Sequence, residues 1–371
     1  MRLLHRYVFA SILATTLIVA LAIAAITAVL GLFDELDHVG NYGMPVALEF
    51  VALQLPRGIY ELFPIIVLLG TLLGLGGLAS GSELVAMRAA GVSLMRLAGS
   101  ALRAGLVFAF VCVLLGEWLA PHAETVEQRL RALTDTKSEW SNAEGGVWLR
   151  DGDTFIHVGV VVSTRLLNDV QFFRFDDQDR LALTREASNA RFDGKRWEMF
   201  DVRSTEFRER RAQSSTVKQM AWETDIDPAL FQASVLPPER QTMRSLYQYL
   251  RYLRDYELDA SLYELAFWSR AAVPVMVLIM ALLAIPFVVG PLRTTGAGQR
   301  MFVGMVVGVV FFLFNEITLS TGRVYGLSPV LSAWLPTALL GGIAIAWLVY
   351  LNWPAPVLRL VRRVSFRPSA A

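Results

Sequence analysis

The side chains best placed to bind a partner protein lie in a short polar segment between two long apolar runs. This segment is ASGSELVAMRAAGVSLMR at residues 79–96. Gly81 and Gly91 bracket helix-forming residues and Ser82 is placed to cap their start, so the sequence predicts a helix over about 82–91. An amphipathic helix of this kind either docks in the groove of a partner protein or merely turns the chain at the membrane surface. The residues alone leave both interpretations open. The side chains that would carry the docking are Glu83, Leu84, Met87 and Arg88.

Patterns that indicate catalysis are missing from the sequence. It has no G-x-x-x-x-G-K-[ST] motif, so the usual loop for ATP phosphates is absent. The four histidines are scattered without metal-ligand spacing, and neither a nucleophile elbow nor a defensible pair of catalytic carboxylates occurs. Cys112 is the only cysteine, which excludes a disulfide within the chain. We therefore expect no catalytic residue, metal or cofactor in this chain, and no nucleic-acid partner.

A few charged residues lie near the other ends of the apolar runs. Counting about 1.5 Å of rise per residue from Arg300, Glu316 lies about 24 Å further along its run. A carboxylate at that depth should face protein, water or a polar ligand group, because facing lipid costs free energy. Arg129 and Arg131 follow the third run and can bind an anionic head group by charge-assisted hydrogen bonds. A solvated helix surface explains these two arginines equally well.

The composition is that of an integral membrane protein. The 371 residues are 54% hydrophobic and 18% charged, with a mean hydropathy of +0.46, whereas a soluble domain carries about 25% charged residues. A helix needs about 20 apolar residues to cross the hydrocarbon layer. We predict three spans, a polar insert and three more spans. The apolar runs lie at about 8–33, 59–80 and 98–120, then from about 267, at 300–320 and at 331–351.

The arginines in the short loops predict the orientation. The N-terminus, the loops after the second and fourth spans and the C-terminal tail are basic, whereas the loop after the first span is acidic. We therefore expect both termini and the segment at 79–96 in the cytoplasm, with the insert on the opposite side of the membrane. The first run is longer than the about 7–15 apolar residues of a signal peptide, so we expect it to be retained as a span.

The insert changes from strand patterns to a helix pattern. Residues 147–160 alternate apolar and polar side chains, and Asp193-Gly194 lies between apolar residues, as in a hairpin. We predict an all-β sandwich of short strands within 122–240. An amphipathic helix within 241–265 should follow, packed on the β domain or lying at the membrane surface. The two sets of spans occupy 1–121 and, with the basic tail, 266–371.

Several stretches of the chain resemble the lipopolysaccharide-export permeases of the LptF/LptG family. They are LLGLGGLASGSELVAMRAAGVS, GEWLAPHAE, FVVGPLRT and VYGLSP. The likeness covers nearly the whole chain, and GEWLAP and GPLR bring it closest to the LptG type, with the LptF-type paralogue as the alternative. The resemblance implies a membrane α-helical fold of six transmembrane helices, three plus three, with an inserted periplasmic all-β jellyroll-like domain, in the bacterial inner membrane.

The resemblance also implies partners. The chain would pair with an LptF-type permease paralogue, and a dimer of an LptB-type ATPase would bind ATP and Mg²⁺ and hydrolyse the nucleotide for both. An LptC-type single-span protein and an LptA-type periplasmic bridge would receive the lipopolysaccharide. The helix at 82–91 would be the coupling helix, with Glu83 as its motif acid. Docking on an ATPase would explain why this segment is polar.

Residues that bind the lipid carry over unevenly from the resemblance. Arg131 matches a basic position that contacts lipid A phosphates, and Arg129 is its neighbour without that match. Asp34 stands where the family has an acid. The family's lysine near the outer end of the first span is absent and Gly31 takes its place, which weakens the expected phosphate clamp on that side.

Spans 1 and 5 would form the lateral gates of such a permease. Three phenylalanines of the fifth span are then candidates to touch acyl chains, with Glu316 close behind them in the chain. Arg270 and Arg323 are candidates to replace the charge that is missing at Gly31. The phenylalanines are Phe311, Phe312 and Phe314.

The favoured function is a permease subunit of an ABC transporter that extracts lipopolysaccharide from the inner membrane and passes it to a periplasmic bridge. The alternative is a membrane-anchored periplasmic binding scaffold with no transport role, which would act without any ATPase. Co-purification of a stoichiometric P-loop ATPase distinguishes the two. A membrane enzyme that acts on lipid ranks last, because the sequence offers no catalytic constellation.

Overall fold

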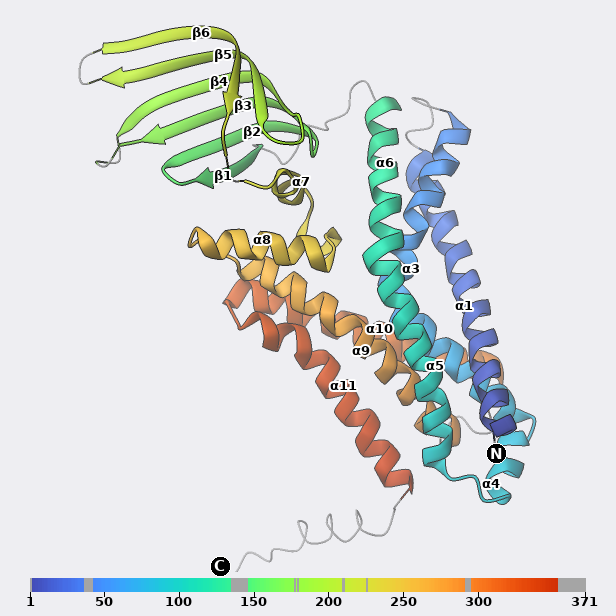
Figure 1. The fold of residues 1–371 in the computed structure, drawn as a ribbon. Helices are drawn as coiled ribbons and strands as arrows, with labels where there is room; N and C mark the ends of the chain where they lie inside the picture. The colour runs from blue at the N-terminus through green and yellow to red at the C-terminus, as the bar shows by residue number, and fades with distance from the viewer. Residues whose placement is uncertain are drawn as a thin grey trace, which may run out of the picture. The chain divides into compact units, whose positions relative to one another are not determined.

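The computed structural model describes residues 2–36, 43–134, 146–176, 178, 180–208, 211–224, 226–290 and 295–352. The chain forms two compact units (Figure 1). The first contains Met1–Glu127 and Phe267–Ala371, and the second contains Gln128–Ala266. The described strands all belong to the second unit, between the third and fourth apolar segments.

The six predicted spans are present as six long helical segments in the described part of the chain. The second begins well before residue 59, because its helix continues through Pro56 and Pro64 instead of ending at the first of these prolines. Its 37 residues extend about 55 Å, which exceeds the about 30 Å of hydrocarbon. The segments are α1 (Arg2–Leu36), α3 (Met44–Ser80), α5 (Leu94–Leu114) continued by η1 (Leu115–Leu119) and α6 (Ala120–Thr134), α9 (Ser261–Val289), α10 (Ala297–Tyr325) and α11 (Pro329–Asn352).

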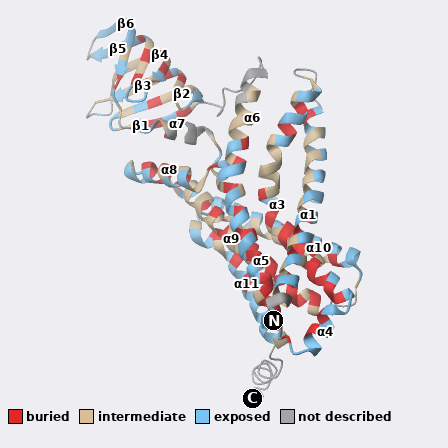
Figure 2. Cartoon of the chain, turned by 45° about the vertical axis from the view of Figure 1, so that its right-hand side comes forward, coloured by how far each residue is buried: buried red, intermediate tan, exposed pale blue. Residues whose placement is uncertain are grey.

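α3 is the central helix of the first unit. It contacts α1, α5 and α10, and the half of α3 that follows Ile66 is almost continuously buried (Figure 2). Glycines bring these helices together: Gly70 and Gly74 of α3 face α1, while Gly304 and Gly308 of α10 face α3. A Cβ atom at any of the four would lie only 2.2–3.0 Å from the neighbouring helix. Such small-residue contacts let membrane helices pack closely.

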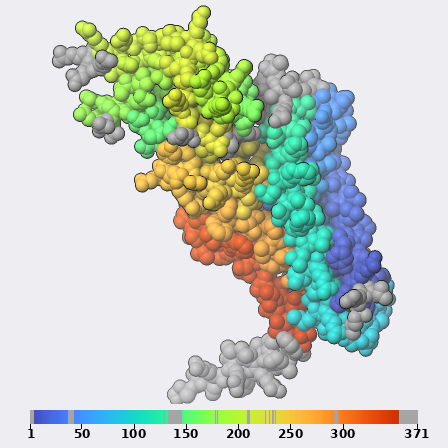
Figure 3. All heavy atoms as spheres, viewed as in Figure 1, coloured from blue at the N-terminus to red at the C-terminus, as the bar shows by residue number. Residues whose placement is uncertain are grey.

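The other spans differ sharply in how much of their surface the unit covers. In the most apolar window of each helix, 72% of α3, 56% of α9 and 50% of the α5 segment are buried, but only 11% of α1, 22% of α10 and 28% of α11. α1 runs along the outside of α5, as the surface in Figure 3 shows. The first unit therefore has a buried centre of α3, α5 and α9, with α1, α10 and α11 at its periphery.

The second unit contains the all-β insert that the alternating pattern predicted. Its six described strands form one antiparallel sheet in chain order, so they make a meander and not the two-sheet sandwich expected from the sequence. Each strand pairs with the next because the turns between them are short. The predicted hairpin is one of them: Gly194 has a φ of +101°, and the Asp193 carboxylate accepts hydrogen bonds from the N–H groups of Lys195 and Arg196. The strands are β1 (Val147–Asp151), β2 (Thr154–Ser163), β3 (Leu166–Phe175), β4 (Leu181–Phe192), β5 (Trp197–Arg208) and β6 (Arg211–Trp222).

One face of this sheet is covered by helices of the same unit. Phe231 of α7 (Pro228–Val235) is fully buried against Trp197 and Trp222, with ring centroids 5.5 and 5.8 Å away. After η2 (Pro238–Arg240), α8 (Met243–Asp255) is the amphipathic helix expected within 241–265. It packs on the sheet, because the Tyr252 hydroxyl donates to the Arg150 carbonyl at 3.1 Å and accepts from the Arg150 N–H at 2.7 Å.

Candidate functional site

The short helix predicted between the second and third spans is α4, Glu83–Ala89. Two of its predicted docking residues, Leu84 and Met87, are buried, with 4% and 9% of their surface exposed. They belong to the main apolar core, which also contains side chains of α1, α3, α5, α9 and α11. Glu83 and Arg88 are exposed. The four residues therefore divide into two that anchor the helix and two that face outward.

The start of α4 differs from the cap that the sequence predicted. Ser82 has a φ of 59°, in the left-handed region, and its side chain makes no capping hydrogen bond. The expected Ser82 cap is wrong because the chain reverses here within a tight turn that follows α3. The backbone N–H of Ser82 donates to the Ala79 carbonyl at 3.1 Å, which closes that turn.

The end of α4 is fixed by Gly91, as its position beyond the helix suggested. Gly91 has a φ of +86°, and its N–H donates to the Arg88 carbonyl at 3.0 Å. The N–H of Val92 donates to the Met87 carbonyl at 3.1 Å. This pair of hydrogen bonds is a Schellman motif. The Val92 and Met87 side chains are both buried in the main apolar core, so the end of α4 is anchored there.

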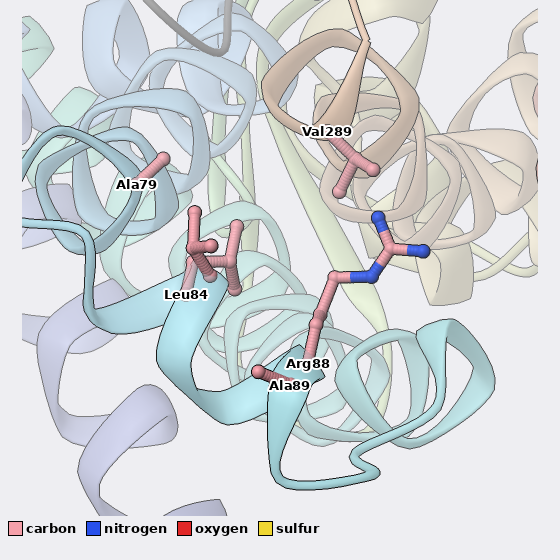
Figure 4. A pocket seen from close by; sticks show the side chains of 6 residues that line it. Ala79, Leu84, Arg88, Ala89 and Val289 are labelled. Atoms are coloured by element: carbon pink, nitrogen blue, oxygen red, sulfur yellow. The ribbon is translucent and has the colours of Figure 1, made fainter.

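A hollow of about 330 Å³ opens beside α4 (Figure 4). It lies between α4 and the end of α9, and the Arg88 guanidinium reaches toward Val289 across it. Its volume is at the lower end of the about 300–1,000 Å³ of ligand sites, which suits an inserted side chain better than a large lipid. It is lined by Ala79, Leu84, Val85, Arg88, Ala89 and Val289.

The exposed side of α4 carries charges of both signs. Glu83 is in the first turn and Arg88 in the last, which is the favourable arrangement in the field of the helix dipole. Among the residues that the structure describes, no acid forms an ion pair with Arg88. The Tyr7 hydroxyl of α1 interacts with the Glu83 carboxylate, and Figures 1 and 2 both show the N-terminal end of α1 beside α4.

The predicted lipid-binding residues are divided between the two units. Asp34 on α1 and Glu316 on α10 are exposed, and both helices pack on α3. Arg131 on α6 is half-buried, and the Arg129 side chain lies outside the described part of the structure. The three gate phenylalanines are on α10: Phe312 is exposed, and Phe311 and Phe314 are half-buried.

The structure shows how two arginines that could replace the lysine missing at Gly31 are already paired. A Cβ atom at Gly31 would lie 3.7 Å from the side chain of Gln54 on α3, an ordinary contact distance. Arg270 is buried and already bound to Glu117, at 2.5 Å. Arg57, one turn beyond Gln54 on α3, pairs with Glu61 at 2.6 Å. The sequence did not single out Arg57, because the second span was expected to start at about residue 59. The spacing of four between Arg57 and Glu61 is nevertheless typical of an ion pair on a helix.

Comparison with known proteins decides the family. The family model described as lipopolysaccharide export system permease LptF/LptG matches residues 6–350. The chain belongs to this family. It is 32% identical over 350 residues to the lipopolysaccharide export system permease protein LptG of Haemophilus influenzae, which covers 93% of this chain and 98% of the relative. It is 30% identical over 340 residues to LptG of Escherichia coli K12, covering 90% and 94%.

These matches confirm the resemblance found from the sequence, including the LptG type. As a member of the LptF/LptG family, the chain is a transmembrane permease subunit of lipopolysaccharide export and a transport protein. The feature that its geometry offers to such a role is α4, a rigidly anchored helix with exposed charges and a hollow at its side.

Proposed function

We propose that this LptG-type chain is a subunit of an ATP-driven transporter in the bacterial inner membrane. It would work with an LptF-type paralogue to extract lipopolysaccharide and deliver it, through an LptC-type protein, to an LptA-type bridge. ATP and Mg²⁺ would be bound by a dimer of an LptB-type ATPase. The observation that carries this proposal is α4, because its exposed charges and apolar hollow suit docking of another protein.

The chemistry of α4 specifies what the ATPase surface should present. A cation should face Glu83, an acid should face Arg88, and an apolar side chain should fill the hollow that Leu84 and Val289 line. Charge-assisted hydrogen bonds of this kind are about twice as strong as neutral ones. They also fix the orientation of the docked surfaces, because like charges in juxtaposition are repelled.

Force applied to α4 has a direct route into the spans. Leu84 and Met87 are part of the core that holds α1, α3, α5, α9 and α11 together. The Schellman motif that ends at Val92 fixes the short connection to α5, which begins at Leu94. Closure of the ATPase dimer on ATP would therefore be transmitted from α4 to these helices.

The orientation in this proposal follows from chain order and charge. α4 precedes the third span and the β unit follows it, so one crossing of the membrane puts them on opposite sides. The arginine-rich loops and N-terminus belong to the side of α4, which makes that side cytoplasmic by the positive-inside rule. The β unit is then periplasmic, on the side to which lipopolysaccharide is exported.

The lipid would use the outer parts of the bundle. Its acyl chains would lie against the exposed side of α10 near Phe312, with Asp34 and Glu316 facing polar parts of the substrate. Arg131 of the second unit is a candidate to bind its anionic groups. Each CH₂ group that leaves an apolar surface costs about 0.8 kcal/mol, so ATP-driven work is needed to lift several chains. The apolar face of the β sheet is filled by Phe231, and lipid could pass over it only if α7 moved away.

Mass spectrometry of the detergent-extracted complex tests this proposal, because it reports protein partners and bound lipid together. We expect a stoichiometric P-loop ATPase, a second permease and a phosphorylated lipid. The matched sample is the Leu84→Asp variant, which should lose the ATPase while it keeps the second permease. A complex that contains no ATPase in either sample would favour a periplasmic binding scaffold and contradict the proposal.

A further inference from the structure

The GEWLAP motif has no part in the docking of α4, but it forms an unusual turn in the third span. Residues Leu115–Leu119 form the π-helical turn η1 between α5 and α6. The N–H of Ala120 donates to the carbonyl of Leu115, five residues back. Isolated π turns are rare and frequently occur at functional sites.

The sequence explains why one carbonyl in this turn is available. In the five-residue register of the π turn, the donor to the Gly116 carbonyl would be residue 121. That residue is Pro121, which has no N–H. The Arg270 guanidinium of α9 donates to the Gly116 carbonyl instead. Its Nε also donates to the Glu117 carboxylate at 2.5 Å.

A third helix enters the same contact. The Tyr60 side chain of α3 packs on Gly116 so closely that a Cβ atom there would lie 2.4 Å from the ring. The Arg270 guanidinium lies 5.4 Å from the centre of that ring, which is cation–π distance. Glycine, glutamate and proline of the motif thus each have a physical reason: room for Tyr60, an ion pair with Arg270, and a free carbonyl.

Burial of Arg270 makes it costly in free energy to break this contact. Arg270 is only 8% exposed, and Tyr60 also 8%, in the part of the chain that crosses the membrane. A buried charge that loses its partner is strongly destabilising, whereas removal of both partners can be nearly neutral. Separating α9 from η1 would leave the guanidinium without its acceptors, and separating it from α3 would remove the Tyr60 ring from the guanidinium. These three segments therefore resist moving apart.

We propose that Arg270 and Glu117 are positioning residues that join α3, the α5–η1 segment and α9 into one rigid body during the transport cycle. Relative movement of the spans would then occur outside this three-segment contact. The link to transport rests on the function proposed above, whereas the rigidity of the three segments does not.

Hydrogen exchange tests the rigid body without any transport assay. In the assembled complex in lipid vesicles, Glu117→Gln should speed exchange of the amides at 112–120 by about tenfold, because the ion pair is lost and its hydrogen bond becomes a weaker one to a neutral acceptor. Glu61→Gln is the matched control, since Glu61 is an exposed acid of α3 in an ion pair with Arg57, and it should leave this exchange unchanged. Wild-type exchange in Glu117→Gln would overturn the proposal.

The double variant Arg270→Met with Glu117→Gln separates positioning from simple folding. The double variant leaves no unpaired charge, so its assembly and ATP hydrolysis should equal those of the wild type. The Gly116 carbonyl, however, no longer accepts a hydrogen bond from residue 270. We expect the double variant to move about tenfold less lipopolysaccharide per ATP than the wild type. Arg270→Lys, which keeps the charge and N–H donors but not the planar fork, should recover part of this loss. Wild-type lipid per ATP in the double variant would overturn the positioning role. Normal coupling in Glu83→Gln would instead contradict the proposed function.

Discussion

Truncation of Leu84 to alanine should detach α4 from the bundle while its exposed charges stay in place. The side chain is 4% exposed within the main core. Losing three buried carbons costs about 2.4 kcal/mol at about 0.8 kcal/mol each. The adjoining hollow lets the site relax, which keeps the total near the lower end of the about 2–5 kcal/mol for such truncations. A loss of about 2–3 kcal/mol shifts the docking equilibrium by about 30–150-fold.

The seven residues of α4 cannot absorb this loss, since isolated helices shorter than about 12–15 residues are marginal in water. Hydrogen exchange measured by mass spectrometry on a peptide spanning 83–92 is the assay. Leu84→Ala should speed exchange there by about 30–150-fold and weaken binding of the ATPase. Val85→Ala is the control, because Val85 is 38% exposed and should leave exchange unchanged. Protection in Leu84→Ala close to that of the wild type would refute the idea that buried side chains hold α4.

Three further predictions concern other parts of the chain. Gly91→Ala should loosen the end of α4 by about 1–2 kcal/mol, because its φ of +86° is strained for alanine, and faster exchange at 88–92 would report it. Gly304→Leu should abolish transport without blocking membrane insertion, since a Cβ atom there already lies 2.6 Å from Leu72; normal transport would exclude this close contact of α10 with α3. Burial raises the pKa of Tyr252 from 10.0 to about 12, so its contribution to stability is complete below pH 10 and is lost as the pH rises through 12. Tyr252→Phe should therefore remove one step from the alkaline tyrosinate absorbance titration of the full chain, and an unchanged titration would contradict the assignment.

The fold was largely predictable because its strongest signals are simple. Long apolar runs predicted six spans, and alternation around Ile156 and Val158 predicted strands. The start of α3 was misjudged, since Pro56 breaks most helices but not this one. The number of sheets was also predicted wrongly, because the described strands form one sheet and not two. Alternation of apolar and polar residues predicts which side chains are buried, but a meander covered by α7 and a two-sheet sandwich bury the same positions.

The site was predictable in position and less so in detail. Spacing and bracketing glycines located α4, and the Gly91 signal worked because a left-handed residue after a helix nearly requires glycine. The outward and inward faces of α4 could not be assigned, because that depends on which spans surround Leu84 and Met87. The contact of Arg270 with Gly116 joins residues 154 positions apart, and no local pattern reveals such a pairing.

The central claim is that a separate ATPase drives export through α4, and ATP-dependent transfer of labelled lipopolysaccharide from vesicles to a periplasmic acceptor tests it most directly. The comparison is wild type against Glu83→Gln, with Glu49→Gln as the control, since Glu49 is an exposed acid of α3. We predict that Glu83→Gln lowers transfer about tenfold or more, as expected for loss of a charged hydrogen bond, while Glu49→Gln transfers normally. Equal transfer by Glu83→Gln and wild type would contradict the account.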